Sequence, residues 1–265
     1  MRVRWLLNLL LLLVVVGLAA LAYLRPGLEE SPPPTTLSQA LPEQAQRVSI
    51  ERPGRGETIS LERREDGWQL TAPINLPANP YRIEPLLQLR RAESHSSFPA
   101  VEAALNQYGL SSPQAWLSID GERYAFGGVE PLNGYRYVMV DHTVHLLSDR
   151  IQHYLLMSSY DFVALELLSP QSELVDVQFD HRVVSDELTL AAWGEAHARR
   201  VSRYAGPDSG VESLSLILND GAVLQLDILL REPEFILGAP ERGVRYHFTE
   251  EEGERLLAMI EDADA

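Results

Sequence analysis

The chain has 265 residues, and its 38 acidic residues against 22 basic ones leave a formal net charge of −16. Every basic residue is Arg, and neither Cys nor Lys occurs. These numbers argue against nucleic-acid binding, which needs clustered positive charge, and they exclude thiol nucleophiles, thiolate metal sites and lysine Schiff bases.

The N-terminal segment carries a nearly unbroken apolar run over residues 6–24. At about 1.5 Å per residue this run reaches roughly 28 Å, close to the ~30 Å hydrocarbon core of a bilayer. It therefore predicts a transmembrane helix in contact with the lipid bilayer, with residues 1–25 forming the cytoplasmic tip and the span. Arg2 and Arg4 precede the run, so the positive-inside rule predicts a single-pass protein of the bacterial inner membrane, with the N-terminus cytoplasmic and the C-terminal domain periplasmic.

A cleaved signal peptide is the alternative for this segment, because Ala20-Leu21-Ala22 has the small-x-small form of a cleavage site. Both interpretations lead to the same compartment. The run is longer than the ~7–15 residues of a signal-peptide core, which favours the anchor. A buried core helix is disfavoured because the run has no polar face.

Residues 26–46 are predicted to be a linker. They contain Pro32-Pro33-Pro34 and scattered Ser, Thr, Gln and Glu, a composition that buries little apolar area. Folded sequence is expected from residue 47 onwards.

The first half of the folded part is predicted to span residues 47–168. The Asp66-Gly67 turn indicates a hairpin, and Asn79 before Pro80 is typical of a helix N-cap. A helix is therefore expected from Pro80 to about Arg91. A second helix with a core-facing apolar stripe, ended by Gly109, is expected at Val101, Ala104, Leu105 and Tyr108.

Short alternating runs then predict an antiparallel meander, closed by a short helix around residues 151–155. Its turns are expected at Asp120-Gly121 and Asp141-His142. The expected strands cover residues 116–119, 124–126, 135–140 and 143–147.

The second half is predicted to span residues 169–265 and to repeat the pattern of the first. Its last helix is indicated by the capping box of Thr249 and Glu252. The fold class expected is α+β: a transmembrane helix, then mainly antiparallel sheets with a few packing helices, in two similar halves. The strands expected here cover residues 174–179, 188–193, 211–218, 223–230 and 244–248.

Candidate chemistry is sparse. His142, His145 and His153 are close enough in sequence to suggest a metal site, but strand positions three apart point to opposite faces, so surface or partly buried histidines are expected instead. The acids at 250–252 are expected to stabilise a helix N-terminus. Trp68 and Trp193 are expected in the core. The sequence predicts no catalytic, cofactor-binding or metal-binding residue, and no enzyme.

Four short motifs follow one another along the chain: Gly67-Trp68-Gln69-Leu70, Asn106-Gln107-Tyr108-Gly109-Leu110, Tyr124-Ala125-Phe126-Gly127 and Tyr135-Arg136-Tyr137-Val138. This ordered set resembles the bacterial family catalogued as domain of unknown function 4340 (DUF4340). The resemblance covers residues 48–150 well and the later half more loosely. It implies a membrane-tethered extracytoplasmic protein, often encoded beside ABC-type export permeases and gliding-related transport components, with no established catalytic residues.

Three functions are compatible with these features. The first is a membrane-tethered periplasmic accessory or interaction module with a protein partner in the cell envelope, associated with an ABC-type export or gliding-related system. The second is a periplasmic ligand-binding domain for a cell-envelope component, which needs an apolar or aromatic cleft between the halves. A hydrolase using Asp, Glu or His is the third, and it requires side chains to converge in a way that the sequence does not show.

Overall fold

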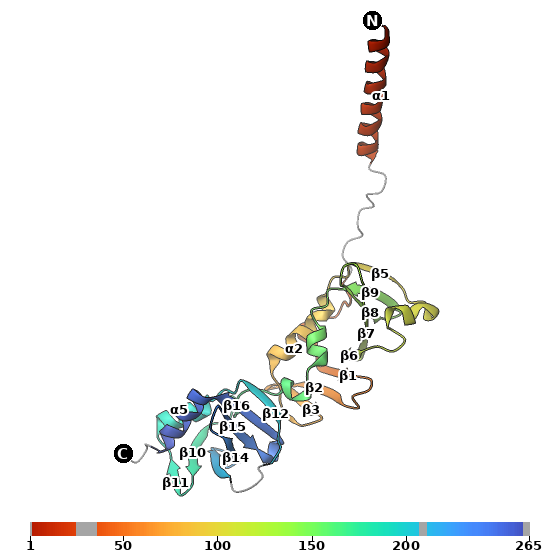
Figure 1. Ribbon diagram of the computed structural model, residues 1–265. Coiled ribbons are helices and arrows are strands. Elements are labelled where there is room, and N and C mark those ends of the chain that lie inside the picture. The colour runs from red at the N-terminus through yellow and green to blue at the C-terminus, as the bar shows by residue number, and fades with distance from the viewer. Residues whose placement is uncertain (1, 25–35, 207–210, 262–265) are drawn as a thin grey trace. The chain divides into compact units, whose positions relative to one another are not determined.

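The computed structural model of this chain describes residues 2–24, 36–206 and 211–261. The chain divides into two compact units, Met1–Thr35 and Thr36–Ala265. The first unit holds one helix, α1 Arg2–Leu24, and the second holds all the strands (Figure 1).

Helix α1 covers the residues for which a transmembrane helix was predicted. A crossing needs about 20 consecutive apolar residues in one helix. In the part of the chain that the structure describes, no helix is long and apolar enough to cross a membrane, so this part of the predicted fold class is wrong. Of the predicted linker, residues 26–35 lie outside the described residues.

The first sheet has nine strands in the order β4-β3-β2-β1-β6-β7-β8-β9-β5, and all its neighbouring strands are antiparallel. The predicted hairpin and meander are therefore confirmed. The strands are β1 Arg47–Glu51, β2 Thr58–Arg64, β3 Gly67–Ala72, β4 Leu76–Pro77, β5 Ser96–Pro99, β6 Ala115–Ile119, β7 Glu122–Val129, β8 Arg136–Val140 and β9 Thr143–Leu147.

Two short helices pack on one face of this sheet, which we call the inner face. Helix α2 Pro80–Leu87 begins at the predicted N-cap, because the Asn79 side chain accepts a hydrogen bond from the Tyr81 amide at 3.0 Å. It continues as η2 Gln88–Arg91, and α3 Gln152–Leu156 is followed by η4 Ser159–Phe162. Their buried side chains, such as Ile83 and Leu155, join the core with the inner-face residues of the strands.

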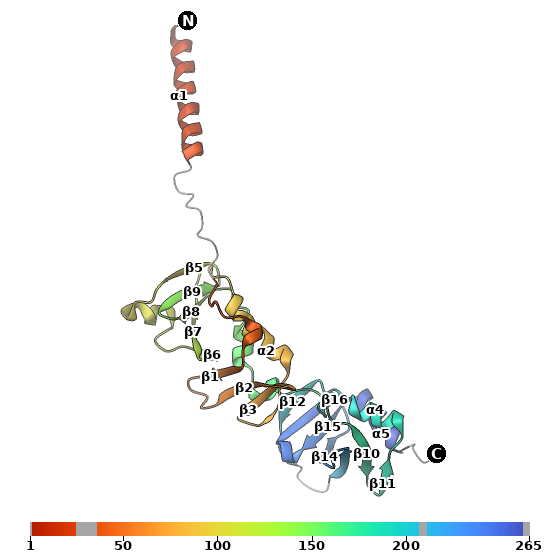
Figure 2. The same cartoon turned by 180° about the vertical axis from the view of Figure 1, so that it is seen from behind.

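The second sheet has seven strands, also antiparallel throughout, in the order β11-β10-β13-β14-β15-β16-β12. Helices α4 Glu187–Gly194 and α5 Glu250–Glu261 contact each other and cover its inner face, as Figure 2 shows from behind. The strands are β10 Leu174–Phe179, β11 Arg182–Val184, β12 Arg200–Arg203, β13 Glu212–Leu218, β14 Val223–Leu230, β15 Glu234–Ala239 and β16 Val244–Thr249, with η5 Pro240–Arg242 between the last two.

The two sheets share one strand order. The run β2-β1-β6-β7-β8-β9-β5 of the first sheet corresponds, strand by strand along the chain, to β11-β10-β13-β14-β15-β16-β12 of the second. Helix α4 takes the place of α2 and helix α5 that of α3. The first sheet is therefore the same unit with the strands β3 and β4 added at one end.

Details of the hydrogen bonding repeat as well. Asp120 N, in the turn after β6, donates to Arg47 O at the start of β1 at 3.0 Å, and Asn219 N, in the turn after β13, donates to Glu173 O just before β10 at 2.9 Å. The pairings β7–β8 and β14–β15 each contain a register shift. The strand order matches β8 with β15 and β9 with β16.

One hydrophobic core runs through the inner faces of both sheets. Two backbone carbonyls of the connection between the halves accept hydrogen bonds from the second half: Ala198 N donates to Leu165 O at 2.8 Å, and the Arg242 side chain donates through Nη1 to Leu167 O at 2.6 Å. Both sheets thus belong to one compact unit.

Residues 36–46 pack on the first sheet, although they were predicted as linker. Leu37 and Ala45 are buried, and a turn of 3₁₀ helix, η1 Pro42–Gln44, lies between them. The buried Arg90 holds this segment, since its guanidinium donates to Leu41 O at 3.3 Å and to the Asp120 carboxylate at 3.1 Å. Apolar burial in this segment was missed because its buried residues are isolated and show no periodicity.

Two predicted elements differ in the structure. The segment around Val101 to Tyr108 is a 3₁₀ helix, η3 Glu102–Tyr108, with no buried residue, and Val101 is 59% exposed, so the expected core stripe is wrong. Residues 188–193 form helix α4 instead of a strand. The Asp186 carboxylate caps that helix by accepting from Thr189 N at 3.0 Å, a local signal that outweighs the alternating leucines.

Trp193 provides a test of this helix. Its side chain is fully buried, and its indole Nε1 donates to Leu256 O on α5 at 3.1 Å. Trp193→Ala is expected to lower the free energy of unfolding by about 3–5 kcal/mol, measured by urea denaturation.

Leu188→Ala is the matched control, because Leu188 lies on the same helix but is 76% exposed. It should change the free energy of unfolding by no more than about 0.5 kcal/mol. Equal losses for the two variants would contradict the placement of Trp193 in the core.

Candidate interaction site

The three histidines considered from the sequence do not form a site. His142 occupies the β8–β9 turn with φ 63°, His145 is buried on β9, and His153 is exposed on α3. Burial lowers the pKa of His145. Among residues 2–24, 36–206 and 211–261 no group of three His, Asp or Glu side chains is placed to hold a metal ion.

Three of the four motifs that resemble the DUF4340 family, those at 106–110, 124–127 and 135–138, converge. The backbone at the end of η3 lies directly against β7: a Cβ atom on Gly127 would stand 2.3 Å from Tyr108 O, and one on Gly109 would stand 2.9 Å from Gly128 N. Gly109 also has φ 67°, which favours glycine. The β7 glycines therefore allow a second segment to cross the strand.

Arg136 ties the same region together from the inner side. It is 5% exposed and binds Asp149 through two hydrogen bonds, Nε to Oδ1 at 2.6 Å and Nη2 to Oδ2 at 2.8 Å. Its Nη1 donates to Gly127 O at 2.5 Å and to the Gln114 side chain at 3.2 Å. The sequence offered no signal for the pairing of Arg136 with Asp149.

On the outer face of the first sheet, opposite the helices, these contacts support a second apolar cluster, here called the outer cluster. Only three of its members are fully buried, and the other seven are partly exposed. The buried members are Leu110, Ala125 and Val144, and the partly exposed members are Phe98, Ala100, Leu105, Tyr108, Trp116, Tyr137 and Met139.

Aromatic rings dominate the exposed part of the outer cluster. The Tyr108 ring lies between Phe98 and Tyr137, with centroid distances of 5.3 and 4.8 Å. The Arg123 guanidinium lies 4.3 Å from the centroid of the Trp116 ring. Burial, followed by Glu130 and Tyr108, raises the pKa of Tyr137, so its hydroxyl remains a hydrogen-bond donor.

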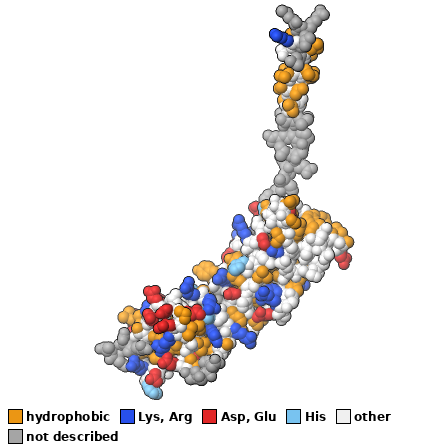
Figure 3. Space-filling view, in the orientation of Figure 1, with side chains coloured by type: hydrophobic (Ala, Val, Ile, Leu, Met, Phe, Trp, Pro, Cys, Tyr) orange, Lys and Arg blue, Asp and Glu red, His pale blue; other side chains and the backbone are white. Residues whose placement is uncertain are grey.

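Further apolar side chains extend this surface. Val101 before η3, Val129 at the end of β7 and Leu132 after it are 59%, 46% and 90% exposed. In Figure 3, hydrophobic side chains gather at the end of the unit that carries η3, the yellow-green helix of Figure 1. Contiguous exposed apolar surface of this kind is typical of an interaction site.

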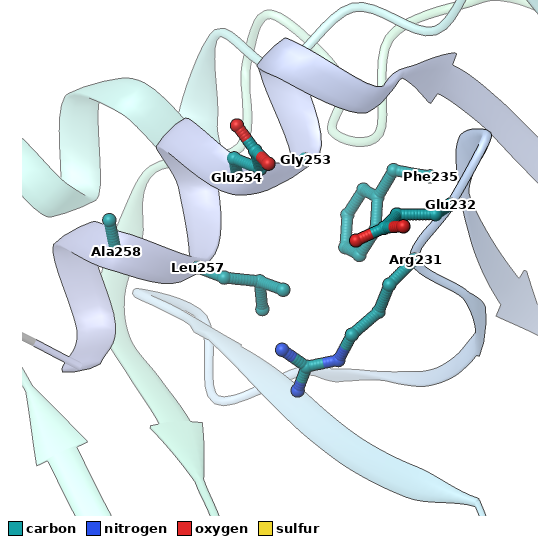
Figure 4. Close-up of a pocket in the computed structure, with 7 residues that line it drawn as sticks. All are labelled: Arg231, Glu232, Phe235, Gly253, Glu254, Leu257 and Ala258. Carbon is teal, nitrogen blue, oxygen red and sulfur yellow. The ribbon is translucent and has the colours of Figure 1, made fainter.

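Two cavities lie elsewhere. One, of about 320 Å³, opens beside α5, where Arg231 and Leu257 reach toward each other and Phe235 forms a wall (Figure 4). The other, of about 300 Å³, lies over a row of paired serines, Ser60, Ser49 and Ser118, on the outer face of the first sheet. Each of these two cavities is lined from one half alone.

The sequence model of one family, described as Domain of unknown function (DUF4340), matches residues 68–179. The resemblance found in the sequence is therefore confirmed. All ten members of the outer cluster fall within the matched residues. No curated protein and no solved structure matches the chain.

The close approach at Gly127 can be tested by adding one methyl group. Gly127→Ala is expected to cost about 1–3 kcal/mol in the free energy of unfolding, since the Tyr108 carbonyl is part of the backbone and must move. The near-ultraviolet circular dichroism of the tyrosines should change with it.

Gly194→Ala is the control for this substitution, because a Cβ atom there would meet nothing within 4 Å. Its stability should equal or slightly exceed that of the parent protein. An unchanged stability of Gly127→Ala would show that η3 does not lie on β7.

Proposed function

From the premise that this chain carries a DUF4340 domain over residues 68–179, we propose that the first sheet is an interaction module that docks a protein partner through the outer cluster. The carrying observation is that residues of three of the four motifs meet at this one surface, where Tyr108, Trp116 and Tyr137 remain partly exposed.

The composition of the surface supports this proposal. Tyr, Trp and Arg are the residues most often responsible for binding energy at protein interfaces, and they act from well-packed centres. The outer cluster offers a rigid centre of this type, because the η3 backbone and the β7 glycines fix Tyr108. The net charge of −16 favours a partner with a positive surface, through long-range attraction.

The setting we propose is the cell envelope, with a component of an ABC-type export or gliding-related transport system as partner. This proposal rests on the family resemblance, which implies an extracytoplasmic protein often encoded beside such transport components. The α5 cavity supports an alternative function, the binding of a cell-envelope component, since about 320 Å³ lies at the lower end of ligand-pocket volumes.

Site-specific photocrosslinking tests the docking surface. A benzophenone amino acid at Leu132, which is 90% exposed beside the outer cluster, is expected to capture a transport-system subunit in membranes from the native host. The same residue placed at Leu188, which is 76% exposed on α4, should not capture it. Trp116→Ala combined with Tyr137→Ala should lower the yield at Leu132 at least ~10-fold, the scale of a binding hot spot.

Thermal melting of the double variant serves as the folding control. Equal crosslinking of the subunit from positions 132 and 188 would refute docking through the outer cluster. The ligand-binding alternative predicts this result, because it assigns no protein partner to the outer cluster.

The proposed setting has its own test. A reporter enzyme that is active only outside the cytoplasm, fused after Ala265, is expected to be active in the host. Activity of a cytoplasm-only reporter at the same position would contradict an extracytoplasmic location.

A further inference from the structure

Three polar side chains meet on the outer face of the second sheet, on the neighbouring strands β12, β16 and β15. Ser202 Oγ lies 2.7 Å from His247 Nε2, and His247 Nδ1 lies 3.3 Å from Glu234 Oε1. The same carboxylate oxygen is held by Arg200 Nη2 at 3.2 Å. The two imidazole nitrogens thus face a hydroxyl on one side and a carboxylate on the other.

The strand pairing brings these residues together. His247 is paired with Arg200 on β12 and with Ile236 on β15, so Ser202 and Glu234 are its diagonal neighbours. The intervening residues point into the core, which fixes the three strands. The three side chains come from sequence positions 202, 234 and 247, and no short sequence motif predicts that they meet.

The fold does not require polar residues at these places. In the first sheet the equivalent strands are β5, β9 and β8, and their outer faces carry Phe98, Val144 and Met139 in one row. The same architecture therefore accepts apolar side chains on the outer faces of these three strands.

The arrangement matches that of an activated serine. His247 is 5% exposed, and burial, together with Arg200 and Arg245, lowers its pKa while Glu234 raises it. The ring is therefore neutral near pH 7, and the carboxylate favours the tautomer that keeps the proton on Nδ1 and leaves Nε2 to accept from the serine. His247 Nδ1 lies 3.3 Å from the carboxylate without hydrogen-bond geometry, and catalytic hydrogen bonds are often poorly aligned before substrate binds.

A further group points to a ligand. Arg245 is paired with Ser202 across the β12–β16 ladder, on the same face. Its Nε is buried and has no hydrogen-bond partner among the described residues. The Arg245 guanidinium is held through Nη2, which donates to Ala205 O. A buried donor without a partner is costly, and an anionic oxygen of a ligand bound next to Ser202 would satisfy Nε.

We propose that Ser202, His247 and Glu234 form a hydrolytic site for carboxylic esters that carry a negative charge. Ser202 Oγ bonds to the ester carbonyl carbon while His247 Nε2 takes the hydroxyl proton. The carbon–alkoxide bond then breaks, and His247 returns the proton to the leaving alcohol. Water, deprotonated in the same way, releases the acid and restores the serine. Glu234 is a positioning residue.

This site is separate from the proposed docking surface. It lies on the other sheet and outside residues 68–179, so either function can fail without the other.

A fluorophosphonate probe tests the nucleophile without knowledge of the substrate. The full-length protein is expected to form one adduct, mapped by peptide mass spectrometry to Ser202. Ser202→Ala should abolish the adduct, and His247→Gln should slow labelling by roughly 10²–10⁴-fold. Ser213→Ala is the matched control, since its hydroxyl lies on the same face but donates to Asp227 at 2.9 Å, and labelling should be unchanged.

The pH profile separates a positioning role of Glu234 from a structural one. The charged groups facing His247 are Arg200 on β12, Glu234 on β15 and Arg245 on its own strand. Labelling should rise with pH as His247 loses its proton. In Glu234→Gln the midpoint should move to lower pH and the plateau should fall, because the carboxylate that stabilises the imidazolium and orients the ring is gone.

The substrate class has its own readout. Hydrolysis of a nitrophenyl ester carrying a sulfonate on its acyl chain should exceed that of the neutral ester of equal length at least ~10-fold in kcat/KM, and Arg245→Gln should remove the preference. Absence of a Ser202 adduct on protein that melts cooperatively, or labelling that survives in Ser202→Ala, would overturn the proposal.

Discussion

A β-sheet has two faces, and in the described part of this protein α-helices cover only one face of each sheet. Helices α2 and α3 cover the first sheet, and α4 and α5 cover the second. Apolar burial at about 25 cal/mol per Å² makes these inner faces the main source of stability. The outer faces are left free of that requirement, and both surfaces argued above to be functional lie there.

The shared strand order makes the contrast between the outer faces informative. At equivalent strands the first sheet carries an aromatic surface around Tyr108 and Tyr137, whereas the second carries the cluster of Ser202, His247 and Glu234. The same strand arrangement thus carries aromatic side chains on the outer face of one sheet and polar side chains on that of the other. Because the inner faces hold the fold in both halves, the outer residues were free to differ.

Local signals predicted much of the fold. Alternating runs and Gly-containing turns located β2, β3, β6 to β9, β13 and β14, and Asn79 and Thr249 marked helix starts that the structure has. The errors occurred where two patterns compete. The leucines before Trp193 alternate as in a strand, yet this segment is a helix. The Asp186 cap and the hydrogen bond of Trp193 to α5 stabilise it. The strands β1, β4, β5, β11, β12 and β15 were not predicted. Of these, β12 is short and Arg-rich, and β15 is buried without alternation.

By itself the sequence determined the properties that neighbouring residues decide: the acidic charge, the absence of thiol and lysine chemistry, most strands and turns, and the motifs that match DUF4340. Only the tertiary structure decided which strands become neighbours, because pairing between distant segments depends on the packing of the whole inner face. That pairing seats Tyr108 on the β7 glycines and brings Ser202, Glu234 and His247 within contact distance. No periodicity in the chain encodes such diagonal contacts between strands.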